Sequence, residues 1–328
     1  MFNGLEHISI ENFKSIKHLP IINLNRINLF IGRPNVGKSN IMEALSLFSV
    51  PYLWENTSKK LSNLVRLETE IKLFYNGNIE KDVVITTNQG KCKLGYNPKD
   101  GLKAEVDFFR NSFLYKIDDK LNVKGSSRNE YFEPPIKKYV FKPDIKYKRC
   151  HSKYLVPPFG FNLFSIIQNY ADLKQQVFDL FKEYNLKIAF DKASQTLKIL
   201  QVNKNNEIIL IPHSSIASTL QETIFYKAAI ATNKNSILLF ENPEAHSFPL
   251  YLSHFTRDMI YKKDNQYFIA TQSPFILNDL LENWRKDLAV FVVYYENHET
   301  KVRKLTSNEL NEVYQNGVDL FTNNESFV

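Results

Sequence analysis

The chain has 328 residues, 43% of them hydrophobic and 23% charged, which is ordinary for a water-soluble globular protein. Its formal charge of +7 and isoelectric point near 9.0 permit an anionic partner such as nucleic acid without requiring one. The chain has two widely spaced cysteines, no apolar run longer than a strand and no export signal at the N-terminus. These features exclude a disulfide framework, a Cys-x-x-Cys zinc centre and a membrane span, so we expect a cytoplasmic protein.

The chain opens with two runs of alternating apolar and polar residues, at 7–10 and 21–31, which predict two strands joined by a short turn at 12–17. The second run leads into the segment GRPNVGKS, residues 32–39, and apolar residues at helical spacing predict a helix over 39–49. This strand, loop and helix order is the context that the phosphate-binding motif G-x4-G-K-[ST] requires. The sequence therefore predicts a nucleotide-binding loop.

The spacing within this loop has a chemical reason. Gly32 and Gly37 let the backbone curl so that successive N–H groups face an anion, and Lys38 reaches the outer phosphates. The hydroxyl of Ser39 is available to Mg²⁺. The residues predicted to contact the nucleotide from this loop are Gly32, Asn35, Gly37, Lys38, Ser39 and Asn40.

The middle of the chain reads as β structure. Residues 61–125 contain short strands, at 71–75 and 83–87, separated by turn signals at 76–78 and 88–90, which predict an antiparallel meander. From Lys137 to Lys153, basic and aromatic residues alternate. They are suited to hold a phosphate backbone and stack on bases, but a β-strand with solvated lysines and half-buried rings has the same composition and is the commoner case.

The last half of the chain alternates helices and short apolar runs. One helix over 166–181, strands at 187–190 and 197–202, and a helix after 212–215 precede the apolar runs 237–240 and 267–270. Such runs predict a parallel sheet covered on both faces, whose ligands gather at the carboxyl ends of the strands. We therefore expect the segments at Gly32, Glu241 and Thr271 to converge on one nucleotide. A capping box at Thr306–Glu309 begins a final helix that ends at Gly317.

Four segments of the chain carry recognisable motifs: 10–16 (IENFKSI), 32–40, 241–246 (ENPEAH) and 270–274 (ATQSP). Together and in this order they resemble the motifs of the RecF/SMC/OLD-type ATPases, which are soluble ATPases of the ABC class within the wider AAA grouping. The resemblance implies an α/β P-loop fold of the ABC-ATPase head type, with a parallel core sheet flanked by helices, an antiparallel β subdomain and a helical lobe. It also implies one domain over 1–328, with 1–50 and 206–328 forming the nucleotide-binding core and about 60–205 inserted.

The resemblance further implies that two copies dock with ATP between them. Glu241 follows four apolar residues and would hold Mg²⁺, usually through a water, together with Ser39. The second copy would contribute a serine-rich helix start, for which we favour Ser218 and Thr219, although this segment lacks the family's glycines. Simple N-capping by these hydroxyls is the alternative.

Two departures from the family pattern concern hydrolysis. Asn242 stands where a glutamate usually acts on the attacking water, and an amide cannot accept a proton, so either Glu244 substitutes or hydrolysis is slow. Gln272 stands where a histidine usually senses the γ-phosphate, and a glutamine can still orient water there. His246 is a weaker candidate to take the place of this histidine. The family's glutamine between the two lobes is not located; Gln89 and Gln168 are the candidates.

These observations predict an ATP-binding protein with weak, partner-dependent ATPase activity, acting on DNA in repair or in defence against foreign DNA. The alternative is a non-catalytic, nucleotide-gated scaffold that holds and releases a separately encoded effector protein. Too few residues follow Pro274 for a TOPRIM nuclease domain, and no heptads persist as in a long coiled coil.

Overall fold

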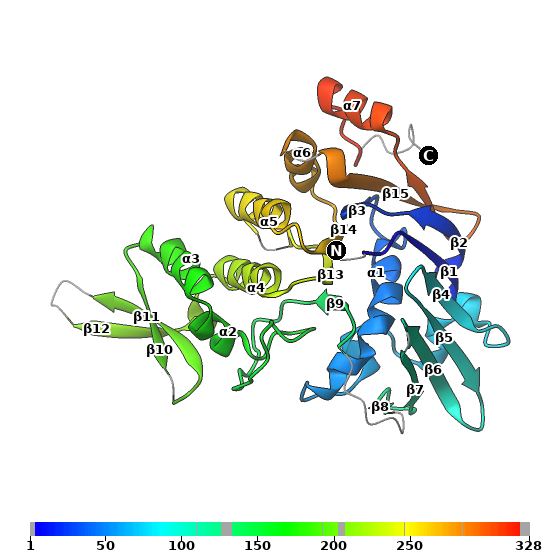
Figure 1. Ribbon diagram of the computed structural model, residues 1–328, viewed down its shortest axis with the longest axis horizontal. Helices are drawn as coiled ribbons and strands as arrows, with labels where there is room; N and C mark the ends of the chain where they lie inside the picture. Colours follow the sequence, from blue (N-terminus) through cyan, green and yellow to red (C-terminus); the bar gives the residue numbers. More distant parts are fainter. Residues whose placement is uncertain are drawn as a thin grey trace. The chain divides into compact units, whose positions relative to one another are not determined.

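The computed structural model describes residues 4–109, 111–125, 133–191, 193–202, 207–245, 247–283 and 285–321. The chain forms two compact units, and their helices and strands are labelled in Figure 1. Unit 1 comprises Met1–Lys138, Asn235–Glu244 and Lys263–Val328, and unit 2 comprises Tyr139–Lys234 and Ala245–Lys262. The expectation of a single domain with an insertion stays a prediction.

A six-stranded sheet in the order β16-β15-β3-β14-β13-β9 carries the predicted nucleotide-binding loop in unit 1. Its strands are β3 (Ile27–Ile31), β9 (Ile136–Tyr139), β13 (Ile237–Glu241), β14 (Gln266–Ala270), β15 (Leu288–Glu296) and β16 (Glu299–Lys304). β13, β14, β3 and β15 pair in parallel. They are almost uniformly apolar and buried, as strands covered on both faces must be. The predicted parallel sheet is confirmed.

The second sheet of unit 1 is antiparallel, in the order β2-β1-β4-β5-β6-β7-β8. Its strands are β1 (His7–Phe13), β2 (Ile16–Asn23), β4 (Val83–Thr87), β5 (Gly90–Asn97), β6 (Gly101–Phe108), β7 (Asn111–Ile117) and β8 (Val123–Lys124). Alternate residues of β6 are buried, which is typical of a sheet with one face on a core. The predicted meander is confirmed from residue 83 onward.

Two predictions about these strands were wrong. Residues 71–75 form the 3₁₀ helices η3 (Glu70–Leu73) and η4 (Tyr75–Gly77), because adjacent Leu73 and Phe74 are both buried and the alternation of a strand is missing. The N-terminal region has three strands instead of two. β1 and β2 extend into the expected turn, which occupies only residues 14–15, and the expected strand at 21–31 is divided between the end of β2 and β3.

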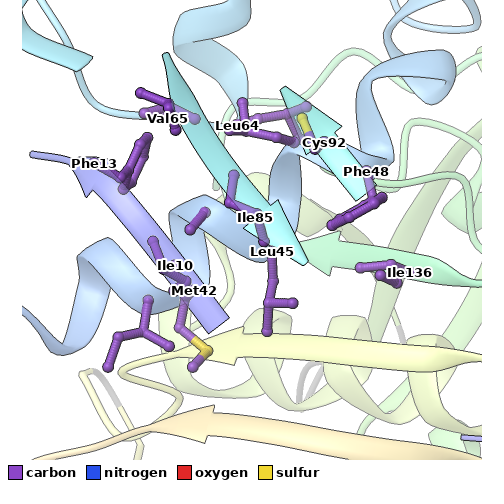
Figure 2. Close-up of a cluster of buried hydrophobic side chains, with 14 of the residues drawn as sticks. Ile10, Phe13, Met42, Leu45, Phe48, Leu64, Val65, Ile85, Cys92 and Ile136 are labelled. Atoms are coloured by element: carbon purple, nitrogen blue, oxygen red, sulfur yellow. The ribbon is translucent and has the colours of Figure 1, made fainter. Parts of the chain in front are cut away.

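Helix α1 (Lys38–Ser46) lies between the two sheets of unit 1 and is continued by the 3₁₀ helix η1 (Leu47–Trp54), where Pro51 interrupts regular hydrogen bonding. Figure 2 shows part of the shared core, with Ile10 of β1, Met42 and Leu45 of α1, and Ile85 of β4. Each such side chain contributes about 1.5–3 kcal/mol by leaving water. This burial holds the N-terminus of α1 at the carboxyl end of β3.

Two further α-helices and two further short 3₁₀ helices belong to unit 1 among its described residues. They are η2 (Leu61–Asn63), α6 (Pro274–Asn283), η6 (Arg285–Asp287) and α7 (Ser307–Asn316), the last beginning after N-cap Thr306. Thr306 accepts the backbone N–H of Glu309, whose carboxylate accepts the N–H of Thr306, and Gly317 ends the helix with a φ of 61°. The predicted capping box and C-terminal glycine are confirmed.

Unit 2 contains helices and a three-stranded sheet in the order β10-β11-β12. Its elements are α2 (Leu163–Asn169), α3 (Ala171–Lys182), β10 (Lys187–Asp191), β11 (Thr196–Val202), β12 (Ile208–Pro212), η5 (His213–Ser215), α4 (Ser218–Thr232) and α5 (Pro249–Tyr261). The two predicted strands are confirmed. The single helix predicted over 166–181 is two helices, because Tyr170 has an extended backbone.

The basic and aromatic segment Lys137–Lys153 is mostly irregular, since its only strand is the end of β9. Lys137 and Lys138 are each 4% exposed, so the interpretation of solvated lysines on a strand was wrong for these two. None of the helices in the described part of the chain has the length and apolar composition needed to cross a lipid bilayer.

Candidate functional site

The carboxyl ends of three adjacent parallel strands meet at one edge of the core sheet. Glu241 of β13 pairs in register with Ala270 of β14, which pairs with Phe30 of β3. The N–H of Asn242 donates to the carbonyl of Ala270 at 2.8 Å, and the N–H of Thr271 donates to that of Phe30 at 3.1 Å. The predicted convergence of the segments at residues 32, 241 and 271 is therefore observed.

The loop between β3 and α1 has the backbone that its glycines permit. Gly32, Asn35 and Gly37 have φ values of 146°, 62° and 103°. A Cβ atom on Gly37 would overlap the hydroxyl of Thr300, so glycine is required there by both conformation and space. The ammonium of Lys38 folds back onto the loop and donates to the carbonyls of Gly32 at 2.6 Å and of Arg33 at 2.7 Å.

A pocket of about 340 Å³ opens beside this loop. It is lined by Pro34, Asn35, Gly37, Lys38, Ser39, Asn40, Arg66, Asn242 and Gln272. Six of these were predicted to bind or act on the nucleotide. Three other predicted residues are bonded to lining residues: the carbonyl of Gly32 accepts from Lys38, Glu241 pairs with Arg66, and Glu244 accepts the N–H of Gln272. Their roles in binding or catalysis stay predictions.

A network of hydrogen bonds connects the loop and the start of α1 to Thr300 and Ser15. Thr300 of β16 donates its hydroxyl hydrogen to the carbonyl of Val36 at 2.8 Å, and its oxygen lies 2.6 Å from the hydroxyl of Ser15. The side chain of Asn40 donates to the same Ser15 oxygen at 2.6 Å. Ser15 belongs to the opening motif recognised in the sequence, whereas nothing near Thr300 signals its place under the loop.

Burial shifts the pKa values of two groups in the site. Burial lowers the pKa of Lys38 to about 8, although the negative charge of Glu244 opposes that shift. Burial also raises the pKa of Glu244, against hydrogen bonds from Gln272 and Thr271. Glu244 Oε1 accepts the N–H of Gln272 at 2.7 Å, while Oε2 is buried without a hydrogen-bond partner among the described residues. Such an orphaned acceptor suits a water molecule held for reaction.

Glu241 is surrounded by donors. Its Oε1 pairs with the guanidinium of Arg66, its Oε2 lies 3.4 Å from the ammonium of Lys138, and Ser39 donates a hydrogen bond to it. Burial alone would raise the pKa of Glu241, but Lys138, Ser39 and Arg66 together hold it below its usual value. The carboxylate is therefore ionised at neutral pH.

Arg66 and Lys138 are residues of the site that sequence reasoning missed. Arg66 comes from a segment without a recognised motif and lies 175 residues from Glu241 in the chain, whereas Lys138 belongs to the basic segment Lys137–Lys153, where no pairing with Glu241 was expected. Arg66 also bonds Glu43 of α1, a carboxylate with no exposed surface that Lys14 pairs with as well. Lys14 stands in the opening motif, which was the one available signal for this cluster.

The donor set fits Mg²⁺. This ion prefers hard oxygen ligands and is usually bound by one or two carboxylates or hydroxyls together with substrate phosphates. The hydroxyl of Ser39 and the ionised carboxylate of Glu241 are such ligands, and their mutual hydrogen bond places them together next to the loop. The residues present therefore suit a magnesium nucleotide.

Several predicted residues lie outside this pocket. Ser218 and Thr219 begin α4 of unit 2, where the N-cap residue is Ala217, so the interpretation of N-capping by these hydroxyls was wrong. Their contact with a second copy's nucleotide stays a prediction. Gln89 donates to the carbonyl of Gly4 at 2.6 Å, and Gln168 belongs to α2, so neither lines the pocket. His246 lies outside the described residues.

Comparison with known proteins gives partial matches in sequence. No protein-family model matches the chain. It is 30% identical over 125 residues to an uncharacterized protein of Methanocaldococcus jannaschii, covering 38% of this chain and 48% of that protein. It is 25% identical over 114 residues to the DNA replication and repair protein RecF of Leptospira interrogans, covering 35% of this chain and 29% of RecF. The matches thus span about half or less of these relatives' length.

Comparison with solved structures covers nearly the whole chain. An SMC head bound to the C-terminal winged-helix domain of ScpA superposes with a TM-score of 0.53 at 11% identity, covering 94% of this chain and 100% of that one. An Smc head with an extended coiled coil, bound to the C-terminal domain of ScpA from Pyrococcus furiosus, gives 0.52 at 12% identity, covering 95% and 98%.

Proposed function

The chain has the fold of a RecF/SMC-type ABC-ATPase head, and from that premise we propose that it binds ATP with Mg²⁺ in the pocket beside residues 32–40. The observation that carries the proposal is the convergence of the glycine loop, Glu241 and Gln272 at the carboxyl edge of one parallel sheet. Ligands of such sheets bind at this edge. The N-terminus of α1 also favours an anion there.

In this proposal, different groups of the pocket bind the phosphates and the metal ion. Backbone N–H groups of the loop hold the phosphates, and Lys38 exchanges its two carbonyl acceptors for phosphate oxygens. Ser39 and Glu241 hold Mg²⁺, which when bound neutralises charge on the phosphate oxygens. Burial lowers the pKa of Lys38 to about 8, so the lysine stays mainly protonated at neutral pH, and phosphate oxygens would stabilise the positive charge that burial disfavours.

Hydrolysis in this proposal depends on Glu244 and Gln272. A carboxylate with a raised pKa is a better base near neutral pH, and Glu244 Oε2 is unpaired among the described residues, so it can accept a proton from water. Gln272 lines the pocket and orients the same water through its side-chain amide. Asn242 occupies the usual glutamate position and has no proton-accepting group. We therefore propose slow turnover that a partner accelerates.

Dimerisation around ATP and action on DNA complete the proposal. A second copy would contribute Ser218 and Thr219 at the N-terminus of α4, where an anion is favoured. DNA would bind the exposed part of the basic and aromatic segment, where half-buried Phe141 and Tyr147 lie among lysines and an arginine. Its exposed basic residues are Lys142, Lys146, Lys148, Arg149 and Lys153. Work on DNA would place the protein in repair or in defence against foreign DNA.

A nucleotide-gated scaffold is the second candidate function. The place of the usual catalytic glutamate is taken by Asn242, and both SMC heads that this chain resembles in fold were solved bound to domains of another protein, ScpA. In this alternative ATP binding assembles the protein and holds a separately encoded effector, and hydrolysis is absent. Nucleotide binding and dimerisation are common to both functions, so turnover with DNA and partner present separates them.

Particle mass and ATP turnover of three variants test the proposal. Lys38→Ala should abolish ATP binding and ATP-dependent dimerisation, because it removes the only lysine of the loop. Glu244→Gln should bind ATP and accumulate as a dimer. Lys91→Ala removes an exposed lysine of β5 and should match the wild type. A wild type that does not bind ATP at millimolar concentration, or Lys38→Ala that binds it equally well, contradicts the proposal.

A further inference from the structure

One arginine joins two carboxylates of the candidate site. Arg66 Nε donates to Glu43 Oε1 at 2.9 Å, its backbone N–H donates to the same oxygen at 3.1 Å, and its Nη2 pairs with Glu241 Oε1. The Arg66 carbonyl accepts a hydrogen bond from Lys14 at 2.5 Å. Glu43 lies one helical turn after Ser39 on α1, so this arginine connects the helix of the phosphate loop with the end of β13.

The two cations on Glu241 differ in how firmly they are held. The Lys138 side chain is 5% exposed and its ammonium also donates to the carbonyl of Leu64 at 2.8 Å, so it is enclosed by protein. The Arg66 side chain is 66% exposed and lines the nucleotide pocket. An exposed ion pair is weak because water and salt compete with it, whereas an enclosed one is broken only at high cost.

An open cavity lies next to the Arg66 side chain. This second cavity has a volume of about 1050 Å³, and its wall includes Leu67, Ile71 and Phe74. Turning the guanidinium from Glu241 toward this cavity would break its Nε bond to Glu43 as well. The backbone N–H of Arg66 and the ammonium of Lys14 would still bond the buried Glu43, so the exchange would leave this carboxylate with partners.

We propose that Arg66 is an exchangeable counter-ion of Glu241, which a divalent cation must displace when it binds with the nucleotide, and that Lys138 is the fixed partner that keeps this carboxylate oriented. The inference rests on the proposed function, because it assumes that Glu241 serves the metal. Its consequence is that the metal-free site holds its own positive charge. A cation without nucleotide phosphates is then a poor competitor, so the metal and the nucleotide bind together.

Binding of Mn²⁺, which takes the same oxygen ligands as Mg²⁺, tests the inference without measuring turnover. Free Mn²⁺ is followed by its paramagnetic resonance signal in the presence of a non-hydrolysable ATP analogue. Arg66→Gln removes the competing charge and should bind Mn²⁺ roughly 3- to 30-fold more tightly than the wild type, as expected for one partly exposed charge near the ion. Equal or weaker binding by Arg66→Gln overturns the inference.

A matched control and a wild-type measurement make the test independent of folding. Lys72→Gln removes an exposed positive charge from the same segment without touching Glu241 and should bind Mn²⁺ like the wild type. In the wild type, the side-chain ¹⁵Nε resonance of Arg66, assigned by its loss in Arg66→Lys, should shift when Mg²⁺ is added to the analogue complex. An unshifted resonance contradicts displacement.

Failure of the proposed function and failure of the role of Arg66 give different binding results. If the wild type and Lys38→Ala bind Mn²⁺ and analogue equally poorly, the proposed function fails and the inference with it. If the wild type binds both, Lys38→Ala does not, and Arg66→Gln binds Mn²⁺ no more tightly than the wild type, only the role of Arg66 fails.

Discussion

The carboxylate of Glu244 accepts the backbone N–H of Gln272 at 2.7 Å, which ties the loop after β13 to the loop after β14. The two residues are 28 positions apart, and the resemblance to the RecF/SMC/OLD-type ATPases suggested a hydrolytic role for both. The bond holds one carboxylate oxygen and leaves the other unpaired among the described residues. The unpaired oxygen is the one to which the proposed function assigns the attacking water.

The first prediction concerns Glu244. Glu244→Gln keeps an oxygen that can accept the N–H of Gln272 but loses the ability to take a proton. Turnover should fall by about 100-fold or more, the usual contribution of a general base, while ATP affinity changes little. Glu80→Gln, at an exposed position, is the control in a phosphate-release assay. Unchanged turnover in Glu244→Gln would remove this residue from the chemistry.

The second prediction concerns Thr300 beneath the phosphate loop. Thr300→Val keeps the shape of the buried side chain but leaves the carbonyl of Val36 without this donor and removes one of the two side-chain partners of the Ser15 hydroxyl. Unit 1 should lose about 1–3 kcal/mol of stability. Thr300→Ser keeps the hydroxyl and should lose less. Thermal unfolding of both variants measures the difference, and equal midpoints would show that the hydroxyl has no role in holding the loop.

The third prediction is a pH dependence of stability from Lys137. Burial lowers the pKa of Lys137 to about 7, against the charges of Glu133 and Glu55. Below pH 7 the lysine is charged in both the folded and the unfolded chain, so folding carries the full cost of burying that charge. Between about pH 7 and the ordinary value of 10.5, the unfolded chain binds the extra proton and stability rises with pH.

Lys137→Met should therefore stabilise the protein most at pH 6, and the gain should shrink steadily toward pH 9. The measurement is the unfolding midpoint of wild type and variant in buffers between these values. Lys120→Met, at an exposed site, should show no such trend. A gain that grows with pH would mean that Lys137 is held in its charged form by partners that outweigh its burial.

The fourth prediction tests the basic segment of unit 2. Replacing the exposed Lys146, Lys148 and Arg149 by alanine should weaken DNA binding and make it less sensitive to salt. Each lost phosphate contact lowers the slope of log affinity against log salt by about 0.9, so three contacts would lower it by about 2 to 3. The matched control replaces three exposed lysines of unit 1: Lys91, Lys99 and Lys120. An unaltered slope in the first variant would exclude this segment as the DNA surface.

Much of the candidate site could be predicted because its signals are local. The phosphate loop needs two glycines, a lysine and a serine within eight residues, and the acid at Glu241 directly follows an apolar strand. Parallel strands place their carboxyl ends at one edge, so these local signals also predicted the convergence with Gln272. By contrast, the strand expected at 71–75 was wrong because local turn signals do not report which side chains the neighbouring sheet buries.

The sequence by itself determined the glycine-containing loop, the parallel core strands and the capped final helix, since each is specified by residues within one turn or one strand of each other. Only the tertiary structure decided that Lys137 and Lys138 are buried, that Thr300 supports the loop, and that Arg66 pairs with Glu241 across 175 positions. These contacts join segments far apart in the chain. Their energies depend on distance and burial in the folded state, which no local pattern of residues records.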